Sequence, residues 1–318
     1  MKRTIIVILC LVGVFALGRT RPVAAQEIIA FGGGPPGSEW YSIAAAIGNV
    51  WQQNIPGVAI KHLPGGGVSN IYSVNSGKAM VGISTSDVND SAVKGTAPFK
   101  EKQTNIKGLI NLYMTYCAIA VWKDSGLRQL KDLKGKALAP GIKGYTYEVI
   151  IRKQLNAVGL DYSDLKKVEF IPANNAADLM KDGHLDASGK TANKFNSFLL
   201  DLASQRDIYL IATPDDVMKK LMAENPGIYP AIVNKGDYNG IDKDIQVVGY
   251  RLCLLINAQT PEDKVYRMVK VMAEHWEKDI HPVSKTFAAV QPKEFAEPIG
   301  VDYHPGALRY FKEKGWVK

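Results

Sequence analysis

Glycine-rich turns recur near the start of this chain, each between a short apolar run and a segment with helical spacing. Two such turns, and a Ser-Asp turn that follows them, occupy residues 32–41, 64–70 and 84–87. The order strand, glycine turn, helix directs unpaired backbone N–H groups and the positive end of a helix toward an anion. Because the arrangement recurs, it predicts a pocket built from several turns. The sequence therefore indicates a receptor for a small anion.

Polar and aromatic side chains stand next to these turns. Ser69 and Asn70 follow the second turn and can add hydroxyl and amide groups around a carboxylate. Tyr41 stands in the first turn of a helix, where its hydroxyl is free to hydrogen-bond, with Trp40 as a wall. The alternatives are a plain flexible bend for the glycines and core packing for the aromatic residues.

A later turn, at residues 141–146, repeats the pattern and carries the positive charge of Lys143. Arg251 begins the apolar half of a long extended run near the C-terminus. We predict that Lys143 or Arg251 pairs with a ligand carboxylate, since arginine in particular offers a bidentate fork. The alternative is an exposed lysine and an arginine paired with a structural carboxylate.

The sequence argues against cofactor binding. Gly32, Gly34 and Gly37 match the spacing of a dinucleotide fingerprint, but Pro35 and Pro36 lack N–H groups where the pyrophosphate would lie. The next strand ends in Lys-His where an acidic ribose partner is expected. No cofactor is therefore expected.

Catalytic and metal-binding patterns are also missing. The chain has no phosphate loop and no Gly-x-Ser-x-Gly elbow, and its five histidines are scattered. Asp87 and Asp90 could form an acid–base pair, but helix capping is the more common role of a Ser-Thr-Ser-Asp turn. We expect no catalytic residues, no metal site and no enzymatic activity.

The N-terminus predicts export. A basic start, an apolar stretch from Ile5 to Leu17 and the small residues Val23-Ala24-Ala25 form a secretory signal peptide, cleaved near Ala25. A membrane anchor is less favoured because the apolar run is short and is followed by Arg19 and Arg21. The expected location is the periplasm.

Charge and cysteine content restrict the partners. The formal net charge of +8 includes four positive residues of the signal peptide, and the remaining basic residues are dispersed, so nucleic-acid binding is not expected. Cys117 and Cys253 lie in apolar runs, which favours buried thiols and leaves a disulfide open. A monomer is expected.

Alternating apolar runs and amphipathic segments predict α/β sheets, with strands expected at 118–122, 168–171 and 185–188, among others. The ligand crevices of such sheets lie at the carboxyl ends of strands. A long extended run at residues 247–257 can return from a second lobe to the first. We therefore expect a two-lobed α/β fold with the ligand cleft between the lobes. The expected parts are a signal peptide at 1–25, a discontinuous first lobe at 26–115 plus 251–318, and a second lobe at 116–250.

Several blocks carry a resemblance to a known family. They lie at residues 65–70, 76–79, 86–88, 123–126, 130–136, 181–187 and 304–310. In order and spacing they resemble the TAXI subfamily of solute-binding proteins, the extracytoplasmic receptors of TRAP transporters, over residues 31–315. The resemblance implies a type II periplasmic-binding-protein fold that closes on a small carboxylate, such as glutamate or a related dicarboxylate, and delivers it to a sodium-coupled permease.

The resemblance also places the pocket. It adds Ser86 and Asp87 in the third turn, residues 144–146 in the second lobe and residues 191–193 in its next turn. With the residues named above, the expected ligand contacts are Ser38, Trp40, Tyr41, Ser69, Asn70, Ser86, Asp87, Lys143, Gly144, Tyr145, Thr146, Thr191, Asn193 and Arg251.

Two departures from the family leave the identity of the ligand open. The first turn carries Pro35, Pro36 and Glu39, whereas the family's turn is shorter and rich in Gly and Thr. The turn at 144–147 reads Gly-Tyr-Thr-Tyr instead of Gly-Ser-Gly-Thr, so Tyr145 fills space or adds aromatic contact. The competing functions are a receptor for an ABC-type importer and an exported enzyme on the same fold.

Overall fold

The computed structural model describes residues 26–194 and 196–318, so the expected signal peptide at 1–25 lies outside the described residues. Within this part of the chain ten strands form one curled mixed sheet in the order β2-β1-β3-β10-β4-β7-β5-β6, with β8 beside β4 and β9 beside β10. The strands are β1 (Glu27–Gly32), β2 (Val58–Leu63), β3 (Val81–Thr85), β4 (Ile106–Trp122), β5 (Ala137–Ala139), β6 (Lys167–Val168), β7 (Ala187–Ala192), β8 (Ile208–Leu210), β9 (Ile228–Val233) and β10 (Ile245–Asn257).

Helices cover the sheet on both faces. They are α1 (Glu39–Asn54), α2 (Gly67–Asn75), α3 (Ser86–Lys94), α4 (Thr146–Ala157), α5 (Ala173–Lys181), α6 (Ser197–Gln205), α7 (Asp215–Glu224), α8 (Glu262–His275), α9 (Lys285–Ala288) and α10 (Pro305–Glu313). A π-helical turn (Trp276–Ile280) extends α8, and short 3₁₀ turns occupy Lys123–Ser125, Leu130–Leu133, Tyr162–Asp164, His281–Val283 and Pro292–Ala296. None of the helices in the described ranges is long and apolar enough to cross a membrane.

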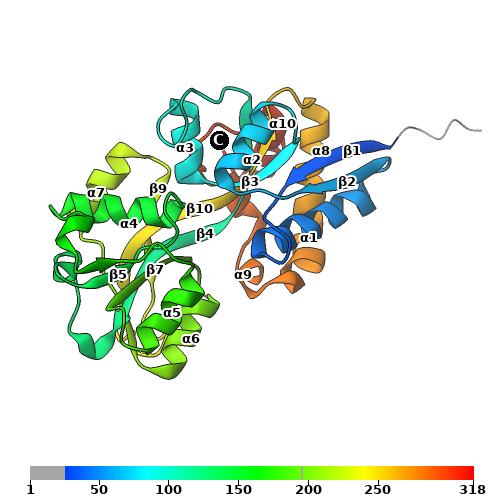
Figure 1. Ribbon diagram of the computed structural model, residues 1–318. Coiled ribbons are helices and arrows are strands. Elements are labelled where there is room, and N and C mark those ends of the chain that lie inside the picture. The colour runs from blue at the N-terminus through cyan, green and yellow to red at the C-terminus, as the bar shows by residue number, and fades with distance from the viewer. Residues whose placement is uncertain (1–25, 195) are drawn as a thin grey trace, which may run out of the picture.

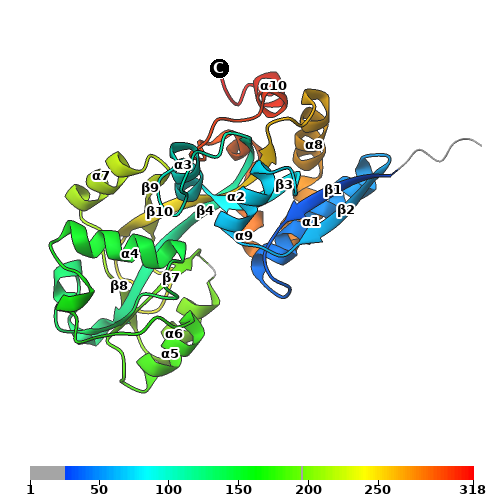
Figure 2. The same cartoon turned by 45° about the horizontal axis from the view of Figure 1, so that its top comes forward.

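Two long antiparallel strands join the two lobes, as Figures 1 and 2 show. Residues 252–256 of β10 pair with β3, whereas its residues 245–250 pair with β9. Residues 106–117 of β4 pair with β10. Its residues 116–121 pair with β7, and its residues 120–122 pair with β8. Both strands therefore run through both halves of the sheet, and the α/β, two-lobed fold that the sequence predicted is present.

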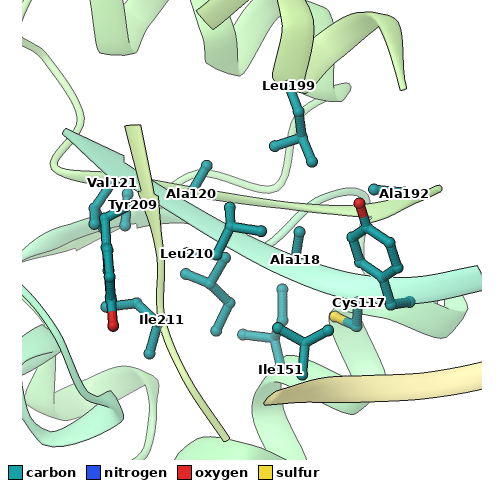
Figure 3. Close-up of a cluster of buried hydrophobic side chains, with 14 of the residues drawn as sticks. Cys117, Ala118, Ala120, Val121, Ile151, Ala192, Leu199, Tyr209, Leu210 and Ile211 are labelled. Atoms are coloured by element: carbon teal, nitrogen blue, oxygen red, sulfur yellow. The ribbon is translucent and has the colours of Figure 1, made fainter. Parts of the chain in front are cut away.

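The apolar side chains form separate clusters. One large cluster contains buried residues from 116 to 250, among them Cys117, Ala118, Leu199 and Leu210 (Figure 3). The two other clusters combine residues from 29 to 113 with residues from 252 to 311. Burial of such clusters is the main favourable contribution to folding.

Helix starts and the return strand agree well with the sequence predictions, but four elements differ. The strand expected at 168–171 is limited to Lys167–Val168 because the chain leaves the sheet before Pro172. Helix α7 and strand β9 were not predicted, and the expected strand at 118–122 is only the end of β4. Strand β4 is buried along most of its length, so it lacks the alternation that reveals a half-exposed strand.

Candidate functional site

The first turn is held by a helix cap. Ser38 caps α1 by accepting the backbone N–H of Tyr41 at 3.2 Å. The Tyr41 ring lies 5.8 Å from that of His62, and burial lowers the pKa of His62, which favours its neutral form. Trp40 is half-buried and covers the start of α2, where a β-carbon at Gly67 would lie 3.8 Å from its ring.

The second turn is held by Asn70. Its buried amide donates to the carbonyl groups of Gly33 at 2.9 Å and of Ile83 at 2.8 Å, which connects the first turn, α2 and β3. Exposed Ser69 accepts the backbone N–H of Gly66 at 2.9 Å. The amide donors of Asn70 are therefore used within the lobe, and its role in the structure is to connect the turns.

The third turn contacts the other lobe. The Ser86 hydroxyl donates to the carbonyl of Gly227 at 2.6 Å and accepts the backbone N–H of Arg251 at 2.8 Å. Asn225 donates its side-chain amide to the Asp87 carbonyl at 2.8 Å. The start of α3 is thus packed against the segment between α7 and β9.

The Asp87 carboxyl group is buried in this contact, and one of its oxygens has no hydrogen-bond partner in the structure. Burial raises the pKa of Asp87 to about 6.

Cys117 and Cys253 are both free and buried, and burial raises the pKa of each thiol. A raised pKa disfavours the thiolate, which is the reactive form, at neutral pH.

The turn of the second lobe contains its own carboxylate. Glu148, which is fully buried, accepts the backbone N–H of Gly144 at 2.8 Å. It also accepts hydrogen bonds from Arg152 at 3.2 Å and Tyr162 at 2.8 Å. One of the N–H groups that the sequence assigned to a ligand is therefore satisfied by the protein.

Aromatic side chains border the same turn. Tyr145 is 53% exposed and lies edge-on to Tyr147, with 6.2 Å between the ring centroids. Exposed Lys143 lies 5.5 Å from the centre of the Phe170 ring. Thr146 is half-buried at the start of α4. Lys143 and Tyr145 are thus accessible to a ligand or to solvent.

The next turn of the second lobe follows β7. The Thr191 hydroxyl is hydrogen-bonded to the Tyr250 hydroxyl, next to the crossing strand β10. The carbonyl of Asn193 accepts hydroxyl groups from Tyr116 at 3.1 Å and from Tyr238 at 2.6 Å. These bonds fix the turn against the strands that connect the lobes.

Two adjacent cavities lie between the lobes at this turn. Their volumes are about 210 and 380 Å³, and Asn193 and Thr286 line both. The lining residues come from both lobes and are mostly polar. They are Glu39, Tyr113, Met114, Asn193, Lys194, Asn196, Ser197, Ser284, Lys285, Thr286, Ala289, Val290 and Glu294.

Arg251 has a protein carboxylate as its partner. Its guanidinium lies 3.0 Å from Glu297 and 4.9 Å from the centre of the Tyr229 ring, and the side chain is 17% exposed. This is the alternative arrangement that the sequence left open for Arg251.

Sequence reasoning missed Glu39 and Lys190. Glu39 lines the larger cavity and accepts the Tyr113 hydroxyl at 2.9 Å. Lys190 lies on β7, but the strand predicted from the sequence stopped at Ser188, so no orientation could be assigned to the lysine. Among the described residues, no group of three or more His, Cys, Asp or Glu side chains could hold a metal ion.

The model of the NMT1-like family matches residues 31–315. Among solved structures, one similar chain is PhnD1 from Prochlorococcus marinus in complex with methylphosphonate, with 11% sequence identity, a TM-score of 0.56 and coverage of 92% of this chain and 100% of that chain. A TctC solute-binding protein from Polaromonas matches with 15% identity, a TM-score of 0.54 and coverage of 91% and 98%. At this identity the likeness shows the fold: a periplasmic-binding-protein fold.

Proposed function

We propose that this chain, which belongs to the NMT1-like family, is an extracytoplasmic receptor that captures a small carboxylate and passes it to a membrane permease. The observation that carries this proposal is the cleft of about 380 Å³ between the lobes, lined by hydroxyl, amide and charged side chains of both. A cleft of this size suits a small molecule held by a few polar groups.

The direction of the sheet supports the same proposal. The turns after β1, β2 and β3 in one lobe, and those after β5 and β7 in the other, all follow the carboxyl ends of strands. Helices α1 and α6 begin at two of these turns, and their first residues line the cleft. The N–H groups at helix starts favour an anionic ligand.

The proposed ligand contacts follow from the exposure of each residue. Five of them are at least partly accessible around the turns: Trp40, Tyr41, Lys143, Tyr145 and Thr146. Asn193 lines the cleft, and Thr191 lies two positions before it. The other expected contacts support these residues from within the protein, since each has internal partners. They are Ser38, Ser69, Asn70, Ser86, Asp87, Gly144 and Arg251.

We propose residues 26–115 with 251–318 as one lobe and residues 116–250 as the other, with β4 and β10 as the hinge. The separate hydrophobic clusters support this division. Small-angle scattering should then give a smaller radius of gyration with saturating ligand. An unchanged radius would argue for a rigid site on a single lobe.

The proposed partner is a sodium-coupled TRAP permease of the TAXI type, and the proposed location is the periplasm, after cleavage near Ala25. The motif blocks at residues 65–70 and 181–187 support this assignment. An ABC-type importer is the alternative partner. Uptake in reconstituted vesicles separates the two, since one depends on a sodium gradient and the other on ATP.

A ligand screen tests the central proposal. Purified protein is heated with L-glutamate, L-glutamine, succinate, succinamate and benzoate, and a bound compound raises the melting temperature by mass action. Mass spectrometry of the incubated mixture should recover the bound compound unchanged. Conversion into a product would instead favour an exported enzyme, and no shift with any compound would argue against a carboxylate receptor.

A further inference from the structure

Lys190 is a partly buried cation on β7. It lies near the end of β7, opposite Ala118 of β4, and its side chain is half-buried. Its ammonium group lies 5.5 Å from the centre of the Phe198 ring. Within residues 26–194 and 196–318, no salt bridge joins Lys190 to a carboxylate, whereas Lys181 has two such partners and Lys194 has one.

Such a position is unfavourable for a charge without a counter-ion. Lysine side chains usually extend their ammonium groups into water, and burial of a charge is costly unless it is paired. Burial lowers the pKa of Lys190, because surroundings poor in water disfavour the charged form. The Phe198 ring offsets part of this cost through a cation–π interaction.

Lys190 does not line the larger cavity itself, but two of its neighbours connect it with that cavity. Phe198 follows Ser197 directly, and Ser197 lines that cavity with Asn196. Glu39, from the opposite lobe, borders the same space and is close enough to favour the charged form of Lys190. The Glu39 carboxylate is held by the Tyr113 hydroxyl at 2.9 Å, and no salt bridge to Lys190 is formed.

We propose that Lys190 binds an anionic group of the ligand and determines the preference of the cleft for charged over neutral ligands. This inference rests on the proposed function, that of a receptor for small carboxylates. The two cations predicted from the sequence fit this role less well: Arg251 has Glu297 as its partner, and Lys143 is exposed, where water and salt weaken its attraction. The ligand class is a dicarboxylate or an amino acid with a side-chain carboxylate.

The test compares acids with their amides. Isothermal calorimetry measures binding of succinate and succinamate, and of L-glutamate and L-glutamine, to the full mature protein and its variants. Lys190→Met and Lys190→Gln should weaken binding of the preferred acid about 10- to 100-fold, on the order of a charge-assisted hydrogen bond, and that of its amide by less than about 3-fold. Lys190→Arg should keep the preference for the acid.

Lys167→Met is the matched control, since this exposed lysine of the same lobe already has Glu169 as its partner at 2.7 Å, and it should bind like the parent. Equal losses for acid and amide in both neutral variants would overturn the inference in favour of a structural role. Unchanged binding would overturn it as well. If the parent protein binds none of the four compounds, the proposed function itself fails, and the role of Lys190 fails with it.

Discussion

Helices α3 and α4 both begin beyond the carboxyl end of a strand, yet the environments of their starts are opposite. Residues Thr85, Ser86 and Asp87 are at most 8% exposed, and β-carbons at Gly227 and Gly300 would lie 2.1 and 2.0 Å from the Ser86 carbonyl oxygen. In the turn before α4, Tyr145 is 53% exposed, and nothing lies within 4 Å of a β-carbon at Gly144. Similar turns thus have different tasks: one packs the lobes together, and the other stays accessible.

The largest expected effect compares two glycines. In Gly227→Ala the new β-carbon would meet rigid backbone atoms of Ser86, so the free energy of unfolding should fall by roughly 3 kcal/mol or more. In Gly144→Ala the only cost is the positive φ of 84°, worth about 1 kcal/mol. Urea denaturation measures both values. Equal losses would mean that the two turns are equally constrained.

Asp87→Asn should stabilise the protein at neutral pH. The pKa of Asp87 is about 6 in the folded protein, above its value of 3.8 in the unfolded chain, so the folded state binds the proton more tightly. The carboxylate therefore destabilises the fold fully above about pH 6, and this cost disappears as the pH falls through 6 toward 3.8. The variant should gain about 2 to 3 kcal/mol at pH 7.5 and nothing near pH 3.8.

Thermal unfolding as a function of pH measures this effect. Asp90→Asn is the control, because Asp90 lies in the same helix but has Lys94 as its partner at 2.8 Å. It should give no gain at pH 7.5. A stability difference between Asp87→Asn and the parent that does not change with pH would contradict the prediction.

Arg251→Ala should destabilise the protein more than Lys143→Ala, because Arg251 is paired and mostly buried, whereas Lys143 is exposed. Arg251 loses its pair with Glu297 and its packing on Tyr229, so the free energy of unfolding should fall by about 1 to 2 kcal/mol. Lys143→Ala should change it by less than about 0.5 kcal/mol, as is usual for an exposed side chain. Chemical denaturation tests both, and a large loss in Lys143→Ala would show that its turn is structural.

Tyr145→Ser should have the smallest effect on stability, since more than half of the side chain is exposed. The expected change is in the preference among ligands, toward smaller and more polar acids, because an aromatic wall is removed. Calorimetry with succinate, L-glutamate and benzoate measures the preference. Identical affinities in variant and parent would place Tyr145 outside the ligand contacts.

The sequence was informative about local structure and less so about contacts between distant segments. Glycine turns and helix starts were predictable because capping and φ preferences act within a few residues. The bond between Ser86 and Gly227 was not, because it joins segments 141 positions apart. Strand β9 was missed because Pro230 lies within it, and proline in a strand usually argues against that assignment.

In the candidate site, too, the sequence was informative about single turns and not about contacts between distant residues. Tyr145 and Lys143 were singled out from their turn, and they are exposed there. The internal partners of Asn70 and Glu148 could not be predicted, since they depend on how the turns pack. Lys190 was missed because an error of a few residues at a strand end removed it from the sheet, and strand boundaries are the least certain part of a sequence prediction.

The pairing of β4 with β10 has a consequence for the order of folding. Ile106 pairs with Asn257 and Cys117 with Val248, so the two strands can meet only after the intervening chain has been made. The cluster within residues 116–250 needs no other part of the chain, whereas the clusters around β1 and β3 need residues from both ends. Contacts between distant segments form slowly. We therefore expect residues 116–250 to fold first. Until β10 pairs with β3, strands β1 and β3 are exposed apolar strands that are prone to aggregation.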